Sequence, residues 1–193
     1  MFKLILLHKQ FFMVVIVMLK IRKANIEDKM KVINLYKLVI EQIKDNEYNP
    51  EWIYGIYPKE KNITEPLEVN EVIVGEIDSE IVSAMVVNHI SNEGYDTVEW
   101  NVDTSDDNVF FVHLVAVNQN FRNRGIAKEM LRYVFNMAEN ESVKSIRLSL
   151  NVNNLGIENL YLKQGFEYVD SITVFIKDRG LKTFNVYEKI ISS

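Results

Sequence analysis

The sequence predicts an α/β (α+β) fold built on a mixed, mostly antiparallel central sheet of about six or seven strands. Three observations favour this class. Residues 71–77 and 81–90 are two apolar runs around a short polar turn, which is typical of an antiparallel hairpin. Residues 109–117 form a β-branched and aromatic run that indicates a buried strand. A helix and an alternating strand at 145–152 follow, and that order requires a parallel, right-handed crossover.

Residues 1–19 are strongly apolar, but they do not form a clean membrane span. Polar residues at 8–10 interrupt them and leave 11–19 as the longest apolar run. That run is much shorter than the roughly twenty residues that a spanning helix needs. Basic residues at 20–23 occupy the place where a signal peptide would need a small-residue cleavage site. We therefore expect no stable membrane span and no export.

The domain organisation follows from the same region. We expect an N-terminal extension at residues 1–17 and a single domain at 18–193, since no linker or repeat divides the rest of the chain. Two alternatives stay open. Translation could begin at Met18, which opens the first expected strand, or residues 1–19 could tether the protein to a membrane.

In chain order, a first strand at 19–24 is followed by a helix to about Lys44, because Asn25 can cap it and apolar residues then recur at helical spacing. The next segment, 50–66, is irregular and carries Trp52, Tyr54 and Tyr57. These rings form either an aromatic cover over the sheet or one wall of a substrate pocket. The remaining elements are expected as a short strand or strand continuation at 95–101, a loop at 103–108, helices at 126–139 and 154–163, and strands at 166–176 and 183–191.

Composition limits the function classes. The chain has 22 basic and 27 acidic residues and a formal charge of −5, so no overall basic field favours nucleic acid. An acidic surface instead favours a cationic acceptor such as an amine. The chain has no cysteine, which excludes a thiolate nucleophile, a cysteine-bound zinc and a disulfide framework. We expect no metal site and a cytoplasmic location, since the absence of disulfides fits a reducing compartment.

The turn after the expected strand at 109–117 leads directly into a helix start. Such a start exposes unpaired backbone N–H groups and the positive end of the helix dipole, which suit a phosphate. Gly125 lets the main chain approach a ligand, and Arg122, Arg124 and Lys128 add positive charge. The alternative is an ordinary helix start with solvated basic residues. Neither a P-loop nor a G-x-G-x-x-G motif is present.

Two motifs together resemble a known family. Arg122-x-x-Gly125-x-Ala127 is similar to the acyl-CoA loop [QR]-x-x-G-x-[GA] of the GNAT N-acetyltransferase superfamily. Downstream, residues 154–166 resemble that family's N-x-x-A-x-x-L-Y-x-x-x-G-F motif, in the expected order and secondary structure. The resemblance implies a GNAT-like sheet with helices on both faces, and acetyl-CoA (coenzyme A) as the cofactor.

The resemblance also implies which residues contact that cofactor, and it implies that the central strand splays from its neighbour so that backbone amides become available. The implied cofactor residues are Val115, Val117, Arg122, Asn123, Arg124, Gly125, Ile126, Ala127, Lys128, Asn154 and Tyr161. Asn154 would cap the short helix or hold the pantetheine arm, and Asn151 and Asn153 are close enough to compete with it. The chain departs from the family at Ile157 and Lys128, where smaller residues are usual.

For catalysis, the resemblance points to Tyr161 as the proton donor to the leaving thiolate, with a packed structural tyrosine as the alternative. Glu99 and His113 are the candidate bases, and water alone could also carry the proton. The resemblance further implies that Trp52, Tyr54 and Tyr57 enclose the acceptor.

The expected function is an N-acetyltransferase, an acyl-CoA-dependent enzyme that moves an acetyl group directly to a primary amine of a small molecule or a peptide N-terminus. The alternative is a non-catalytic acyl-CoA-binding or regulatory module. A homodimer is allowed by the sequence but not indicated by it.

Overall fold

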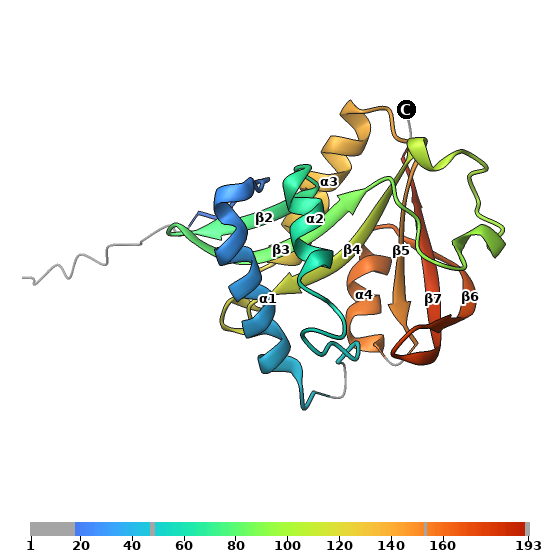
Figure 1. The fold of residues 1–193 in the computed structure, drawn as a ribbon. Helices are drawn as coiled ribbons and strands as arrows, with labels where there is room; N and C mark the ends of the chain where they lie inside the picture. The colour runs from blue at the N-terminus through green and yellow to red at the C-terminus, as the bar shows by residue number, and fades with distance from the viewer. Residues whose placement is uncertain (1–17, 47–48, 153, 192–193) are drawn as a thin grey trace, which may run out of the picture.

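A computed structural model describes residues 18–46, 49–152 and 154–191. The described residues form one seven-stranded sheet with the order β1-β2-β3-β4-β5-β7-β6 (Figure 1). The strands are β1 (Lys20–Lys23), β2 (Val72–Ile77), β3 (Glu80–Asn88), β4 (Val109–Val117), β5 (Ser145–Asn151), β6 (Glu167–Ile176) and β7 (Gly180–Ile190). Among the strand pairs of the described residues, β4–β5 is parallel and the others are antiparallel, which confirms the predicted mixed, mostly antiparallel sheet. The expected extension at 1–17 lies outside the described residues.

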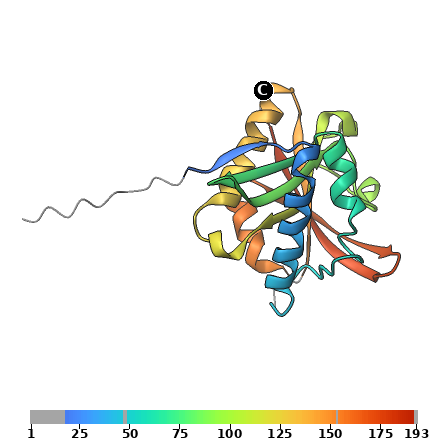
Figure 2. The same ribbon diagram turned by 60° about the vertical axis from the view of Figure 1, so that its left-hand side comes forward.

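Helices cover both faces of this sheet, as predicted. They are α1 (Lys29–Ile43), α2 (Lys61–Glu68), α3 (Ile126–Asn140) and α4 (Leu155–Lys163). One buried apolar cluster joins α1 and α2 to alternate residues of β2, β3 and β4. A second cluster joins α3 and α4 to the opposite face, which Figures 1 and 2 show as separate layers. Among the described residues, no helix has the length and apolarity that crossing a bilayer requires.

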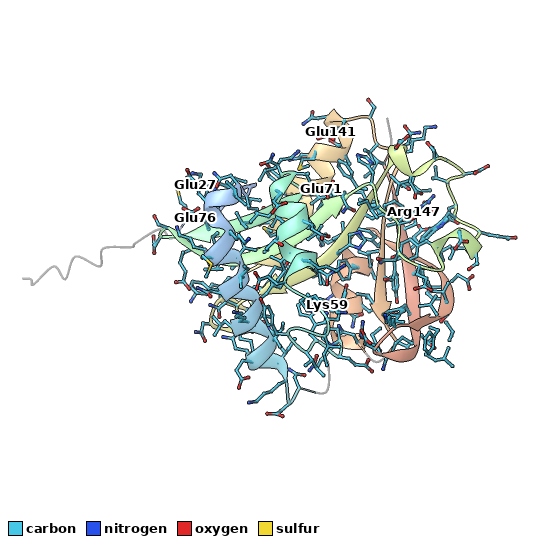
Figure 3. The ribbon with its side chains drawn as sticks, viewed as in Figure 1. Glu27, Lys59, Glu71, Glu76, Glu141 and Arg147 are labelled. Carbon is cyan, nitrogen blue, oxygen red and sulfur yellow. The ribbon has the colours of Figure 1, made fainter. Side chains whose placement is uncertain are left out.

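The first helical region begins at the predicted cap. The side chain of Asn25 accepts a hydrogen bond from the Glu27 N–H (2.9 Å), and Asp28 accepts one from the Asn25 N–H (3.0 Å). Arg22 on β1 contacts Asp28 at 2.6 Å and Glu76 on β2 at 2.9 Å, and the pKa of Asp28 is lowered, chiefly by the hydrogen bond from Arg22. Glu27 and Glu76 lie at this end of the sheet (Figure 3). The two ion pairs of Arg22, with Asp28 and with Glu76, thus join β1 and β2 to the start of α1.

The short strand expected at 95–101 is wrong. Residues Tyr95–Thr97 form a 3-10 turn, and the described residues between β3 and β4 contain no strand. The rings of Tyr95 and Trp100 instead pack on each other, and the Trp100 Nε1–H donates to the Tyr95 carbonyl (3.0 Å). Arg147 of β5 lies 4.3 Å above the Trp100 ring and donates to the Val102 carbonyl (2.6 Å). These contacts hold the segment across the sheet rather than along its edge.

The central strand β4 leaves its parallel neighbour partway along. Only Val109–Phe111 pairs with β5, through Ser145–Arg147. On the other side, the β3–β4 register shifts between Ala84 and Val86, and Leu114 has a φ of +52°. The hydroxyl of Tyr36, from α1, donates to the Leu114 carbonyl (2.7 Å). A bulge held from α1 therefore lies where β4 diverges from β5.

Strand geometry then determines which amides face the opening. The Asn118 N–H donates to the Val82 carbonyl of β3 (2.9 Å). Since successive N–H groups of a regular strand alternate in direction, the Val117 N–H is directed away from β3 and faces the gap that β5 has left. The Val115 N–H belongs to the trans peptide whose carbonyl accepts from Tyr36, so it is directed away from α1.

We predict that Tyr36→Phe lowers the free energy of unfolding by about 1–3 kcal/mol, because it leaves the buried Leu114 carbonyl without its hydroxyl donor. Urea denaturation measures this change. Tyr168→Phe is the control, since that side chain is 52% exposed, and it should change stability by less than about 0.5 kcal/mol. Equal stability of Tyr36→Phe and the unmodified protein would contradict the proposed role of this contact.

Candidate active site

The loop after β4 has the predicted strand–turn–helix geometry. Gly125 lies in the left-handed region (φ +75°) at the N-cap of α3, and a Cβ added there would meet nothing within 4 Å. Space is thus open in front of the helix N-terminus. Gln42 of α1 secures the loop, since its amide donates to the Asn118 side chain (3.0 Å) and accepts from the Gln119 N–H (2.9 Å). The sequence analysis missed Gln42, because nothing in a helix pattern marks a residue that contacts a loop 76 positions away.

A cavity of about 490 Å³, here called the loop cavity, lies beside this loop. The second half of β4, the loop, the start of α3 and the N-terminal half of α4 surround it, with Val39 and Ile43 of α1 as apolar wall. The predicted cofactor residues that line it are Val115, Val117, Arg122, Asn123, Gly125, Ile126, Ala127, Lys128 and Asn154.

A second cavity of about 260 Å³, here called the hairpin cavity, lies between the diverging strands and the β6–β7 hairpin. Its walls are mainly apolar and aromatic. The two cavities have Pro50, Trp52, Val115, Asn154 and Ile157 as common lining residues. They therefore meet at the opening between β4 and β5, and Ile157, one of the two departures from the family motifs, lies at that junction.

Tyr161 of α4 lines the hairpin cavity and is only 2% exposed. Its ring packs edge-on against Phe166, with 5.6 Å between centroids. Burial raises the pKa of the Tyr161 hydroxyl, so it remains protonated at neutral pH. Asn154 is the N-cap residue of α4, but its side chain makes no capping hydrogen bond. Of its two expected roles, contact with a ligand is therefore the one its position favours; Asn153 lies outside the described residues.

His113 of β4 also lines the hairpin cavity. Its Nε2 lies 3.1 Å from the Ile90 carbonyl oxygen and 3.2 Å from the Asn88 side-chain oxygen. Because both neighbours are acceptors, Nε2 carries the proton in the neutral ring and Nδ1 keeps its lone pair. Burial lowers the pKa of His113 from 6.5 to about 4. The imidazole is thus neutral near pH 7.

The described geometry can be compared with known proteins. The Acetyltransferase (GNAT) family matches residues 34–166, which is more than half of the chain. The chain belongs to the GNAT acetyltransferase family. This membership confirms the resemblance seen in the motifs, and the predicted class, an acyl-CoA-dependent acyltransferase, is the class of that family.

Solved GNAT structures share the fold. An acetyltransferase of Streptococcus agalactiae 2603 has a TM-score of 0.71 and 20% identity, with 91% of this chain and 96% of that chain covered. For one of Listeria monocytogenes 4b F2365 the values are 0.69, 22%, 89% and 94%. For the ribosomal-protein-S18-alanine N-acetyltransferase of Escherichia coli they are 0.65, 12%, 91% and 96%. At these identities the likeness shows the fold alone.

A curated relative is similar over a shorter stretch. The chloroplastic GCN5-related N-acetyltransferase 4 of Arabidopsis thaliana is 39% identical over 61 residues. Those residues are 32% of this chain and 21% of the relative, so the match spans about a fifth of that protein.

Within this GNAT fold, three predicted site residues lie away from both cavities. Glu99 is exposed on the segment before β4 and lines neither cavity. The Tyr54 hydroxyl donates to Glu60 (3.2 Å), so of the three aromatic candidates only Trp52 and Tyr57 reach a cavity. Arg124 lies 5.1 Å from the Phe121 ring rather than in the loop cavity. Of the two candidate bases, the structure brings only His113 to the site.

The sequence analysis also missed the contribution of the β6–β7 hairpin. Ile172, Val174 and Ile176 of β6 and Arg179 of the turn line the hairpin cavity. Strand alternation in 166–176 could have indicated one face, but no local signal shows that this face meets Trp52, more than a hundred residues earlier. The sequence analysis gave residues 177–182 no role beyond separating the strands expected at 166–176 and 183–191.

We predict that His113 makes the protein acid-sensitive. Below about pH 6.5 the unfolded chain takes up a proton that the folded His113 takes up only near pH 4, so stability falls by up to about 3 kcal/mol as pH decreases through this window. Urea denaturation at pH 7 and pH 4.5 measures the loss. His113→Gln keeps a neutral hydrogen-bond donor and should lose clearly less. The same loss in both proteins would show that His113 does not titrate in this way.

Proposed function

We propose that this chain transfers an acetyl group directly from acetyl-CoA to a primary amine, on a small molecule or at a peptide N-terminus. The observation that carries the proposal is that two cavities meet where β4 diverges from β5. One has the features of a site for an anionic cofactor, and the other is a mainly apolar pocket lined by the buried Tyr161. Transfer between two substrates needs such a meeting point.

The loop cavity fits a CoA moiety. The N-terminus of α3 provides backbone N–H groups and a positive dipole end for the pyrophosphate, and Arg122 and Lys128 add charge. Gly125 leaves the approach open. Apolar walls from α1 and α4 suit the rest of the molecule. When bound, acetyl-CoA would supply the acetyl group as a reactive thioester.

Backbone groups of β4 would orient the thioester. The Val117 N–H faces the gap and could donate to an amide carbonyl of pantetheine, and the Val115 N–H is directed away from α1. Val115 lines both cavities, so its N–H is the one suited to the negative charge that develops on the thioester oxygen.

Proton transfer falls to two buried side chains. Tyr161 would donate its proton to the leaving thiolate sulfur, because its raised pKa keeps the hydroxyl intact until the sulfur becomes basic. Nδ1 of His113 would accept a proton from the amine, directly or through water. Its low pKa makes His113 a weak base, so we propose that it passes the proton to water rather than holding it.

Acetyl-CoA binding followed by thiol release tests the proposal. Calorimetry should detect one acetyl-CoA per chain, and a panel of small amines and peptides should then include acceptors that release thiol. The peptide arm is included because one similar structure is named for an alanine of ribosomal protein S18. Binding without release from any acceptor would favour the non-catalytic module, and no binding would refute both functions.

We predict that Gly125→Asp weakens acetyl-CoA binding at least about tenfold relative to Gly125→Asn. The two side chains have the same shape and both tolerate left-handed backbone, so they differ only in a charge placed at the helix N-terminus. Calorimetry measures both dissociation constants. The difference should shrink in high salt. Equal affinities of the two variants would show that the pyrophosphate does not bind next to Gly125.

We predict that Tyr161→Phe lowers kcat by about 10²- to 10⁴-fold while the dissociation constant of acetyl-CoA changes little, since the hydroxyl is needed only when the sulfur leaves. Tyr133→Phe on α3, which lines neither cavity, is the matched control. Stopped-flow thiol detection and calorimetry separate the two effects. A normal kcat would leave Tyr161 as a packing residue.

A further inference from the structure

Arg179 is a cation buried at the hairpin end of the hairpin cavity. It lies in the turn between β6 and β7, its side chain is only 8% exposed, and it lines the cavity. The tip of this hairpin lies beside the irregular segment that joins α1 to α2 (Figure 2). A buried guanidinium normally has its donors satisfied, because leaving them unpaired costs free energy.

The contacts of Arg179 leave most of its five N–H donors unused. Its Nη2 is 3.6 Å from the Glu51 carboxylate, which is longer than a hydrogen bond, and Glu51 lies closer to Lys182 at 2.6 Å. The guanidinium also lies 4.8 Å from the centre of the Tyr57 ring. Among the described residues, no side chain or carbonyl accepts a hydrogen bond from it.

A purely structural role does not account for a buried arginine here. Lys182–Glu51 and Lys59–Asp178 (3.3 Å) already join the hairpin to the segment before α2, and the side chains of both pairs are partly exposed (Lys59 is labelled in Figure 3). Such exposed pairs provide the same connection without burying a charge. Arg179 therefore has unused donors at a cavity that it lines, in addition to any role in joining the two segments.

The rest of the hairpin cavity is nearly uncharged. Among the described residues that line it, Glu93 is the other side chain that carries a charge at neutral pH, and it is exposed. His113 is neutral, because burial lowers its pKa to about 4. The walls are mainly aliphatic and aromatic, with Leu148, Ile172, Val174, Trp52 and Tyr57, and the uncharged polar residues among the lining are Asn92, Ser149, Asn151 and Asn154. A ligand there meets one buried positive charge, a mainly apolar surface and some neutral polar groups.

We propose that the acceptor is an amine that also carries a carboxylate, bound by Arg179, and an apolar group that packs against the apolar cavity walls. Its amine would then lie at the junction with the loop cavity, next to Tyr161. The planar guanidinium can bind a carboxylate through two parallel hydrogen bonds. This chemistry is that of a free apolar amino acid or of a peptide N-terminus with an acidic side chain. The inference rests on the proposed function and narrows its substrate class.

Binding of acetylated ligands tests the inference separately from turnover. N-acetyl-L-leucine and N-acetyl-L-leucinamide differ in the carboxylate alone, since neither has an ionisable amine. Calorimetry with the CoA-saturated protein should show that the carboxylate form binds at least about tenfold more tightly. Arg179→Gln should abolish this preference, and Arg179→Lys should keep part of it. Thermal melts check that both variants are folded.

Two further variants separate direct contact from general charge. Lys177→Gln removes the same charge from an exposed position in the same turn and should leave the preference unchanged. Glu51→Gln removes the carboxylate nearest to Arg179 and should strengthen binding of the carboxylate form. A preference that survives Arg179→Gln would overturn the inference. Equal binding within the leucine pair would also overturn it if the aspartyl and asparaginyl peptides described next bind equally as well.

A second pair of ligands identifies the source of the carboxylate. N-acetyl-L-aspartyl-glycinamide and N-acetyl-L-asparaginyl-glycinamide place or omit an acidic side chain on a peptide. Preference for the aspartyl peptide over its partner, with no preference in the leucine pair, assigns the carboxylate to a peptide side chain. If these preferences are found but no amine is ever acetylated, the proposed function fails while Arg179 remains a carboxylate site.

Discussion

The divergence of β4 from β5 after Phe111 is the constraint on which the rest of this structure depends. Three residues of each strand pair in parallel, and beyond them the strands separate and create the space that both cavities occupy. The paired end is firmly held. Arg147 on β5 donates to Glu188 on β7 (2.8 Å), and both side chains are almost fully buried. Breaking such a pair leaves an uncompensated buried charge, so this contact holds β5 and β7 together at the end where β4 and β5 are paired.

The open end is shaped by elements that lie far apart in sequence. Tyr36 and Gln42 on one helix contact the β4 bulge and the loop after β4, so α1 sets both the direction of the strand and the position of the α3 N-terminus. Helix α4 lies on the opposite face and brings Tyr161 to the same gap. A site assembled from both faces in this way would hold the proposed proton donor, the amide edge of β4 and the proposed phosphate-binding end of α3 in fixed positions relative to one another.

Much of this arrangement was predictable from sequence, because it depends on local pattern. The bounds of β4 and the start of α3 follow from an apolar run, a polar turn and a glycine that adopts positive φ. What was not predictable depends on contacts between distant segments. Alternation along β4 could not say that His113 faces a cavity, nor that Glu99 stays exposed on a segment that forms a turn instead of a strand. Arg179 and Tyr57 meet only in the folded chain. Tyr57 was a candidate pocket residue, but nothing within its own segment marks Arg179.

The most direct test of the central claim is the backbone amide spectrum of the protein during titration with acetyl-CoA. The account predicts that the amide resonances of Val115 and Val117 shift together with those of 125–128, because the opened edge of β4 and the N-terminus of α3 would bind one molecule. It also predicts little change along β1 and β2, on the far side of the sheet order. Shifts confined to other strands, or an unperturbed β4 at saturating acetyl-CoA, would contradict the claim that the divergence of β4 from β5 forms the binding site.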